Sequence, residues 1–246
     1  MSWKGYLKAR FLMSKKMKRT KITDIGKAWN RKPETKMLRV ESIDKKKSFL
    51  IICEGENTEP EYFKSIPVGN ATVDSYGLGQ SKTALVKSVL EVLKNDKETR
   101  EKEIWVVFDM DIKEDQHSQQ KEDYNRAIEL ALSKNIQVAY SNDSFELWFL
   151  LHYQFIDSQL KRHQYYERLS DLWQCSYEKE GKNYSFCRKI YKLLKDDERA
   201  DRSQACSWAK KLLNAQEDLP YSDQNPCTTV FKLINELLPP DEKTDD

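Results

Sequence analysis

The chain reads Cys53-Glu54-Gly55-Glu56-Asn57-Thr58-Glu59-Pro60-Glu61-Tyr62-Phe63 directly after the apolar run Phe49-Leu50-Ile51-Ile52. The apolar run predicts a buried strand, and the segment after it predicts a helix, because proline is well tolerated in a first helical turn. Four carboxylates fall within eight positions where the strand gives way to the helix. Carboxylate oxygens are the ligands that hard divalent cations prefer, so this strand end is a candidate metal site.

A second apolar strand also ends in acidic residues. The run Ile104-Trp105-Val106-Val107-Phe108 does not alternate with polar residues, which is typical of a strand buried on both faces of a sheet, and Asp109-Met110-Asp111 follows it. Residues i and i+2 of an extended strand point to the same side, so both aspartates are expected to face one cation. We predict a Mg²⁺ or Mn²⁺ site anchored by Asp109 and Asp111. Glu54 is its general base or a ligand that bridges to a second metal.

Strands and helices alternate along residues 48–155, which predicts an α/β fold with a mainly parallel sheet of about four strands and helices on both faces. The predicted strands are 48–54, 71–76, 103–109 and 136–142, and the predicted helices between them are 59–66, 82–95 and 121–134. Ligands of such sheets bind beyond the carboxyl ends of the strands. Both acidic clusters are expected at that edge.

An almost wholly apolar helix is predicted over residues 145–153. Glu146 is costly to bury there without a partner, so it is predicted to reach the edge of the helix, a cation or the metal, and we treat it as an accessory metal ligand. His152 is predicted to be a hydrogen-bonded core histidine. Asp143 is either a further ligand or a cap for this helix.

Helical patterns dominate from residue 156 onward, near 157–174, 184–195, 203–214 and 226–238. Ser203 is the predicted N-cap of the third of these helices. We therefore expect a basic N-terminal arm (1–47), an α/β core (48–155) and a mainly helical C-terminal region (156–246) packed on the core. Whether that region is a subdomain or an interaction surface stays open.

The other charged and aromatic residues of these segments are given simpler roles. Glu59 is a candidate accessory metal ligand at a helix start, whereas Glu56 and Glu61 are predicted to face water. The segment 77–81 is expected to form a tight turn, which leaves Lys82 at the active edge of the sheet to contact a phosphate. The basic pairs are predicted to be solvated helix faces and the aromatics to be core: Lys161-Arg162, Arg188-Lys189 and Lys210-Lys211, and Tyr165, Tyr166 and Trp173.

Charge is distributed unevenly along the 246 residues. The formal net charge is +2, but residues 1–47 hold 16 Lys or Arg against 4 Asp or Glu, a balance of +12, so the remainder carries about −10. Such an arm is typical of polyanion binding, with Lys15, Lys16, Lys18 and Arg19 as predicted nucleic-acid contacts. A solvated tail is the alternative. Five scattered cysteines and the lack of a signal-like or membrane-spanning apolar segment favour a reduced, cytoplasmic protein with no membrane partner.

Four motifs together resemble the RloB family, which includes AbiLii of bacterial abortive infection. They are CEGENTEPEYF (53–63), VFDMD (107–111), AYSNDSFELWFLLHY (139–153) and NPCTTVFKL (225–233). The resemblance implies a Toprim-like, Rossmann-like domain in which Glu54 is the Toprim glutamate and Asp109 and Asp111 form the Asp-x-Asp pair. It also implies an anti-phage nuclease toxin that acts on RNA, tRNA included, or on DNA, with an ATPase partner encoded alongside.

Two other functions stay open at this point. A non-catalytic subunit would use the same site to hold nucleic acid or a partner's nucleotide in an ATPase-linked defence complex. A phosphatase acting on a small phosphoester would leave the basic arm without a purpose.

Overall fold

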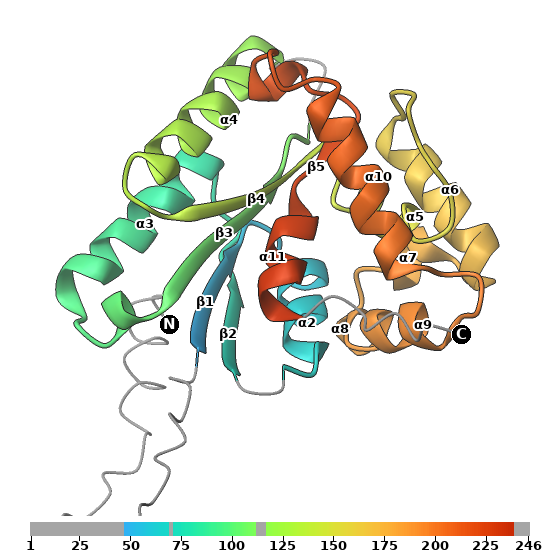
Figure 1. Ribbon diagram of the computed structural model, residues 1–246, viewed down its shortest axis with the longest axis horizontal. Coiled ribbons are helices and arrows are strands. Elements are labelled where there is room, and N and C mark those ends of the chain that lie inside the picture. The colour runs from blue at the N-terminus through green and yellow to red at the C-terminus, as the bar shows by residue number, and fades with distance from the viewer. Residues whose placement is uncertain (1–46, 69–70, 112–116, 239–246) are drawn as a thin grey trace, which may run out of the picture. The chain divides into compact units, whose positions relative to one another are not determined.

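A five-stranded sheet in the order β2-β1-β3-β4-β5 organises this computed structural model, which describes residues 47–68, 71–111 and 117–238 (Figure 1). The strands are β1 (Lys47–Cys53), β2 (Ala71–Gly77), β3 (Glu103–Asp109), β4 (Gln137–Asn142) and β5 (Cys227–Thr228). The first four pair in parallel and β5 pairs antiparallel with β4. The predicted mainly parallel α/β sheet is confirmed. Residues 1–46 of the basic arm, including Lys15, Lys16, Lys18 and Arg19, lie outside the described residues.

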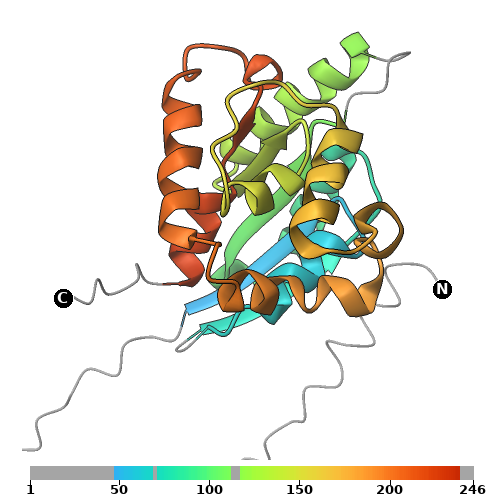
Figure 2. The same cartoon turned by 90° about the vertical axis from the view of Figure 1, so that its right-hand side faces the viewer.

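Helices cover both faces of the sheet, as predicted. They are α2 (Thr58–Ser65), α3 (Lys82–Asn95), α4 (His117–Leu132), α5 (Glu146–Leu150), α6 (Arg162–Trp173), α7 (Tyr177–Glu180), α8 (Tyr184–Cys187), α9 (Ile190–Asp196), α10 (Arg202–Asn214) and α11 (Val230–Leu237), with 3₁₀ turns η2 (Thr99–Glu101) and η4 (Tyr221–Asp223). Helices α3 and α4 lie on one face. Helices α2, α5 and α11 lie on the other, and the view in Figure 2 has the C-terminal helices in front of the sheet.

The central strands are buried on both faces because their successive side chains enter two different cores. In β1, Phe49 and Ile51 face the core under α2, α5 and α11, whereas Leu50 and Ile52 face the core under α3 and α4. β3 divides its side chains in the same way. This double burial explains the unbroken apolar runs.

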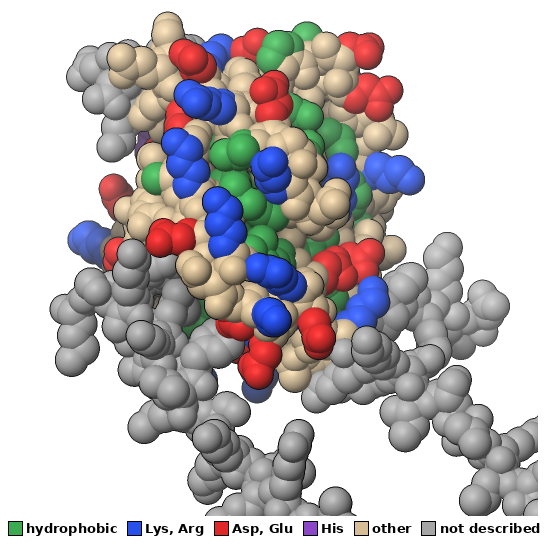
Figure 3. Space-filling view, turned by 90° about the vertical axis from the view of Figure 1, so that its left-hand side faces the viewer, with side chains coloured by type: hydrophobic (Ala, Val, Ile, Leu, Met, Phe, Trp, Pro, Cys, Tyr) green, Lys and Arg blue, Asp and Glu red, His purple; other side chains and the backbone are tan. Residues whose placement is uncertain are grey.

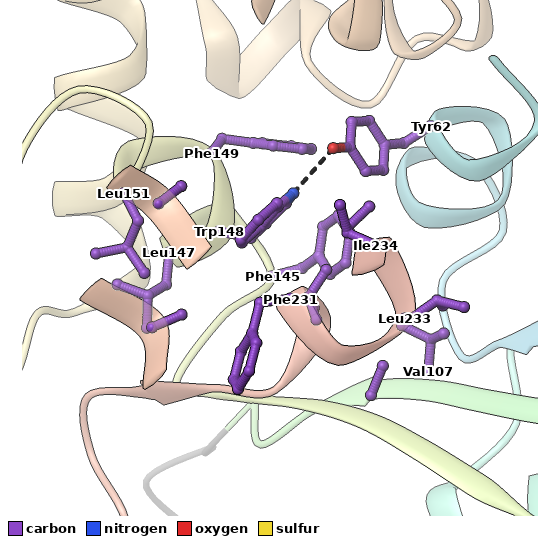
Figure 4. Close-up of a cluster of buried hydrophobic side chains, with 14 of the residues drawn as sticks. Tyr62, Val107, Phe145, Leu147, Trp148, Phe149, Leu151, Phe231, Leu233 and Ile234 are labelled. Carbon is purple, nitrogen blue, oxygen red and sulfur yellow. Dashed lines mark hydrogen bonds between the residues drawn. The ribbon is translucent and has the colours of Figure 1, made fainter. Parts of the chain in front are cut away.

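The larger core is aromatic and gathers around α5. Trp148 is fully buried, and its indole N–H donates to the Tyr62 hydroxyl at 2.9 Å, which joins α5 to α2 (Figure 4). The rings of Phe145 and Phe149 meet Tyr62 edge-on at centroid distances of 6.0 and 5.2 Å. Edge-to-face pairs of this kind stabilise a core beyond the area they bury.

The C-terminal helices differ in detail from the predictions. Asp201, not Ser203, is the N-cap of α10, because its carboxylate accepts the backbone N–H of Gln204 at 2.9 Å. The predicted helix 184–195 is broken into α8 and α9, each of which packs against α2. The segment 226–238 begins with β5 instead of helix. A two-residue strand carries no periodic pattern, and its pairing with β4 is a tertiary effect that local propensity does not contain.

The surface seen from the side of α3 and α4 mixes Lys and Arg with Asp and Glu around apolar side chains (Figure 3). None of the five cysteines forms a disulfide. Within the described ranges, no helix is both long enough and apolar enough to cross a membrane.

His152 is a satisfied core histidine, as predicted. Its side chain is buried, Nδ1 lies 2.9 Å from the Trp148 carbonyl oxygen, and burial lowers the pKa of the imidazole from 6.5 to about 4. The unfolded chain therefore binds the proton more tightly than the folded one. The contribution of the neutral His152 to the free energy of unfolding is fully present above pH 6.5 and is lost as the pH falls toward 4.

A His152→Asn variant tests this pH dependence, because the Asn amide can still donate to Trp148. Between pH 7 and pH 5 the wild-type protein is expected to lose about 2 kcal/mol more unfolding free energy than the variant. Urea denaturation at several pH values measures the difference. Parallel pH curves for the two proteins would contradict the neutral, buried state of His152.

Candidate active site

An acidic cavity of about 230 Å³ lies at the carboxyl ends of β1 and β3. Five carboxylates line it, namely Glu54, Glu59, Asp109, Asp111 and Glu146, and a sixth, the exposed Glu56, lies at its mouth. The strand order runs outward in opposite directions from β1 and β3, so the cavity is at the topological switch point of the sheet. That is where ligands bind in open parallel sheets.

Parallel pairing brings Glu54 and Asp109 together. Cys53 is in register with Val107, and the backbone N–H of Glu54 continues the ladder by donating to the Val107 carbonyl at 2.8 Å. The two acidic strand ends therefore meet because neighbouring strands finish at the same level. The predicted juxtaposition of Glu54, Asp109 and Asp111 at one edge of the sheet is present in the structure.

Asp111 reaches the cavity by a different route from the predicted one. The strand ends at Asp109, and Asp111 has φ 44°, a left-handed conformation, so the two aspartates do not share one face of an extended strand. Asp tolerates this conformation better than most residues. The N–H of Asp111 donates to the Asp143 carbonyl at 3.2 Å, while the Asp143 side chain does not line the cavity.

Arg162, the first residue of α6, bridges the two aspartates. Its Nη2 lies 3.2 Å from Asp109 Oδ2 and its Nη1 lies 3.1 Å from Asp111 Oδ1. The prediction that Lys161 and Arg162 form a solvated helix face is wrong for Arg162, since α6 begins at the mouth of the cavity and turns this side chain inward. Burial raises the pKa of Asp109 well above its usual value, and the charge of Glu59 adds to the rise, whereas Arg162 opposes it.

Glu54 is held by Lys82. The Lys82 ammonium lies 3.0 Å from Glu54 Oε1, and only about a tenth of the Lys82 side chain is exposed. Burial raises the pKa of Glu54 above 4.5, while Lys82 lowers it. Lys82 does not line the cavity, so its contact with a phosphate stays a prediction. In the structure the Lys82 ammonium is paired with Glu54.

The segment after β2 holds this part of the site through its backbone. The N–H groups of Leu78 and Gly79 donate to the carbonyl oxygens of Cys53 and Glu54 at 3.1 and 2.9 Å. Gly79 has φ 60°, which favours glycine. The two amides are thus bonded to the last residue of β1 and to Glu54, and the tight turn expected over residues 77–81 stays a prediction.

Glu59 enters the cavity from the first turn of α2. Its carboxylate lies against Gly55, where a β-carbon would collide with it unless the Glu59 side chain moved. Burial raises the pKa of Glu59 to about 7, and the negative charges of Glu146 and Glu54 add to the effect. Glu59 is thus placed with the other acids, as predicted for an accessory ligand.

Glu146 is held by two hydroxyl groups. It is buried at the start of α5 and accepts hydrogen bonds from Ser144 and, at 3.1 Å, from Tyr177 on α7. These contacts supply the partners that a buried carboxylate needs. They also aim the Glu146 carboxylate at the cavity.

Of the two acids predicted to face water, one is exposed and one is not. Glu56 is exposed. Glu61 is buried, 3% exposed, and pairs with Lys64 at 2.6 Å and more distantly with Arg188 at 3.9 Å. The prediction for Glu61 is wrong because α8 and α9 cover α2, and these helices lie more than a hundred residues away in sequence.

Two further residues of the cavity carry no sequence signal. Lys182 and Tyr166 line it, with the Lys182 ammonium 5.8 Å from the centre of the Tyr166 ring. Tyr165 is fully buried and Trp173 packs against the core, as predicted, but Tyr166 also faces the cavity. Tyr166 is on α6 and Lys182 lies between α7 and α8, so only the packing of the C-terminal region shows that both line the cavity.

The donor set fits a divalent cation in charge and in atom type. Six carboxylates face three cationic groups, Arg162, Lys182 and Lys82, so negative charge is in excess. Within residues 47–68, 71–111 and 117–238, no three His, Cys, Asp or Glu side chains are close enough to hold a metal by themselves. Magnesium needs only one or two carboxylates when waters and substrate phosphate complete its shell, and Asp109 and Asp111 are the residues that would hold it.

Comparison with known proteins gives one match. A family model described as RloB-like protein matches residues 49–237, from the third residue of β1 to the last residue of α11. No curated protein and no solved structure matches the chain. The matched span contains the whole cavity.

Proposed function

This chain belongs to the RloB-like family, and from that premise we propose that it is a metal-dependent nuclease-like effector that hydrolyses phosphodiester bonds in RNA or DNA. Membership of the family is consistent with a role in defence. The fuller proposal is an anti-phage abortive-infection toxin with a Toprim-like core, tRNA among its possible substrates and an ATPase partner encoded alongside. We also propose that the protein acts in the cytoplasm.

One observation supports the catalytic proposal above the others. A cavity at the switch point of the sheet collects Glu54, Asp109 and Asp111 from two neighbouring strand ends and adds cationic groups from α6 and the α7–α8 turn. Acids that hold a cation, next to cations that hold a phosphate, are the parts that phosphoryl transfer requires. A bound divalent cation would neutralise developing charge on the phosphoryl oxygens and acidify a bound water.

Glu54 is the general base of the proposed reaction. Burial moves its pKa upward from 4.5, closer to the working range of a base at neutral pH, while Lys82 keeps the carboxylate ionised and oriented. Glu54 would take the proton of the attacking water. Lys82 is then a positioning residue, since its ammonium acts through Glu54.

The size of the cavity favours a phosphate group over a whole nucleotide. A volume of about 230 Å³ is below the roughly 300–1,000 Å³ typical of sites that enclose a small molecule. A backbone phosphate with its cation and waters fits this space, while the bases stay outside. Lys182, which is exposed and lines the cavity, is the cation that we expect to bind a phosphate oxygen.

A second function, binding without catalysis, is favoured by the pairing of Asp109 and Asp111 with Arg162. Permanently paired aspartates would leave no anchor for a catalytic metal. The cavity would then serve a regulatory subunit that holds nucleic acid or a partner's nucleotide through Lys182. Cleavage by the purified protein distinguishes the two functions.

Glu54→Gln is expected to lower the rate of manganese-dependent cleavage at least about 100-fold, because an amide cannot take a proton from water. The measurement is cleavage of tRNA, single-stranded RNA and DNA by purified protein, with cell growth on expression as a second readout. Glu129→Gln, an exposed carboxylate on α4 that does not line the cavity, is the matched control and is expected to keep the wild-type rate. Equal loss in both variants, or no cleavage by the wild type in any arm, would count against the catalytic function.

A further inference from the structure

We propose that Arg162 is an internal occupant of the cation site: it holds Asp109 and Asp111 before a divalent cation binds and is displaced from them when the cation enters. The inference rests on the proposed function, because it concerns the same anchor residues. It adds a regulatory step, since the site is closed by its own side chain until a cation competes for it.

The contacts of Arg162 are those of a replaceable partner. The two N–H···O distances, 3.2 and 3.1 Å, are longer than the 2.7–2.9 Å usual for charged pairs, and the guanidinium is divided between two carboxylates instead of forming a fork on one. The Nε atom is buried and has no hydrogen-bond partner among the described residues. The Arg162 side chain is therefore held by its attraction to the two carboxylates, while one of its donors, Nε, makes no hydrogen bond among the described residues.

The backbone at Arg162 is secured independently of its side chain. The N–H of Lys161 donates to the Gln164 side chain at 2.8 Å, and the N–H of Gln164 donates to the Lys161 carbonyl at 2.9 Å. These bonds fix the start of α6. The guanidinium can therefore leave the aspartates without unwinding the helix that carries it.

A divalent cation and the guanidinium compete for the same two carboxylates. Magnesium or manganese would carry twice the charge at shorter distances to oxygen, and a cation at the pair would repel the guanidinium. Glu146 lines the same cavity as Arg162, so the guanidinium has another acid nearby. Lys182 lines the same cavity without an ion pair to either aspartate, which makes it a matched control for charge alone.

The test compares Mn²⁺ affinity in wild type, Arg162→Gln and Lys182→Gln by isothermal titration calorimetry, with Asp109→Asn as the non-binding reference. If Arg162 occupies the site, Arg162→Gln binds Mn²⁺ on the order of tenfold more tightly, within the 5–150-fold span of coupled binding events. Lys182→Gln changes the affinity by less than about threefold, because loss of a nearby charge alone has a smaller effect. Equal tightening in the two variants overturns the inference.

Arginine-labelled wild-type protein supplies a second measurement that does not depend on the folding of a variant. Titration with Mg²⁺ should shift the Arg162 Nε–H signal, which is assigned by its loss in Arg162→Gln or, if that variant fails to fold, in Arg162→Lys. A signal that stays unchanged while Mg²⁺ binds overturns the exchange but leaves the proposed function in place. If neither Mn²⁺ nor Mg²⁺ binds to any of the proteins, the proposed metal-dependent function itself is overturned.

Discussion

Asp109→Asn should reduce metal-dependent phosphodiester cleavage at least about 1000-fold while the protein stays folded. A lost metal anchor removes several kcal/mol of transition-state stabilisation, and each 1.4 kcal/mol corresponds to a factor of ten in rate. Asp109 is the acid to choose because it ends β3 inside the cavity, and only 14% of its side chain is exposed. Circular dichroism and thermal melting establish that the variant is folded before its cleavage rate is measured.

Asp223→Asn is the matched control for that experiment. Asp223 also pairs with a basic residue, Lys121, at 2.7 Å, but the pair lies at the surface and Asp223 does not line the cavity. Surface ion pairs contribute little to stability, so this variant should keep both its fold and its cleavage rate. An Asp109→Asn protein that cleaves as fast as Asp223→Asn would remove Asp109 from the metal site.

Trp148→Ala has the largest expected effect on stability. The side chain is fully buried in α5 between the sheet and α2, and its removal leaves both a cavity and an unpaired Tyr62 hydroxyl. We expect the free energy of unfolding to fall by about 3–5 kcal/mol, which approaches the whole stability of many domains. Urea denaturation followed by far-ultraviolet circular dichroism measures the loss.

Trp208→Ala gives the comparison for Trp148, because Trp208 on α10 is only partly buried and packs against Phe155 at the edge of the same core. Its removal should cost less than half as much. Similar losses in the two variants would mean that α5 is not the centre of the core. Such a result would also weaken the account of how Glu146 is positioned.

The sheet was predictable because its strands are marked by local pattern. The run 104–108 is apolar at every position and matches β3, and the predicted helix 82–95 matches α3 residue for residue. Acidic residues at two strand ends predicted where Glu54 and Asp109 meet, because the carboxyl ends of parallel strands share one edge. Local sequence is enough to predict an element when the residues of that element alone carry its pattern.

Arg162 and Glu61 show where such prediction ends. Both residues were expected to face water, and both lie against segments that are far apart from them in the sequence. Arg162 pairs with Asp109, which is 53 positions away. Glu61 on α2 lies near Arg188, which directly follows α8. A charged residue in an amphipathic helix has the same local pattern whether it faces solvent or an acidic cavity. Only the packing of the C-terminal region on the core distinguishes the two cases.

The most direct test of the acidic cavity as a metal site is an anomalous difference map from crystals of the wild-type protein grown with Mn²⁺. We predict a peak inside the cavity, bound by Asp109 and Asp111, with Arg162 displaced from both. A map with ordered carboxylates, saturating Mn²⁺, no peak in the cavity and Arg162 still on the two aspartates would contradict it.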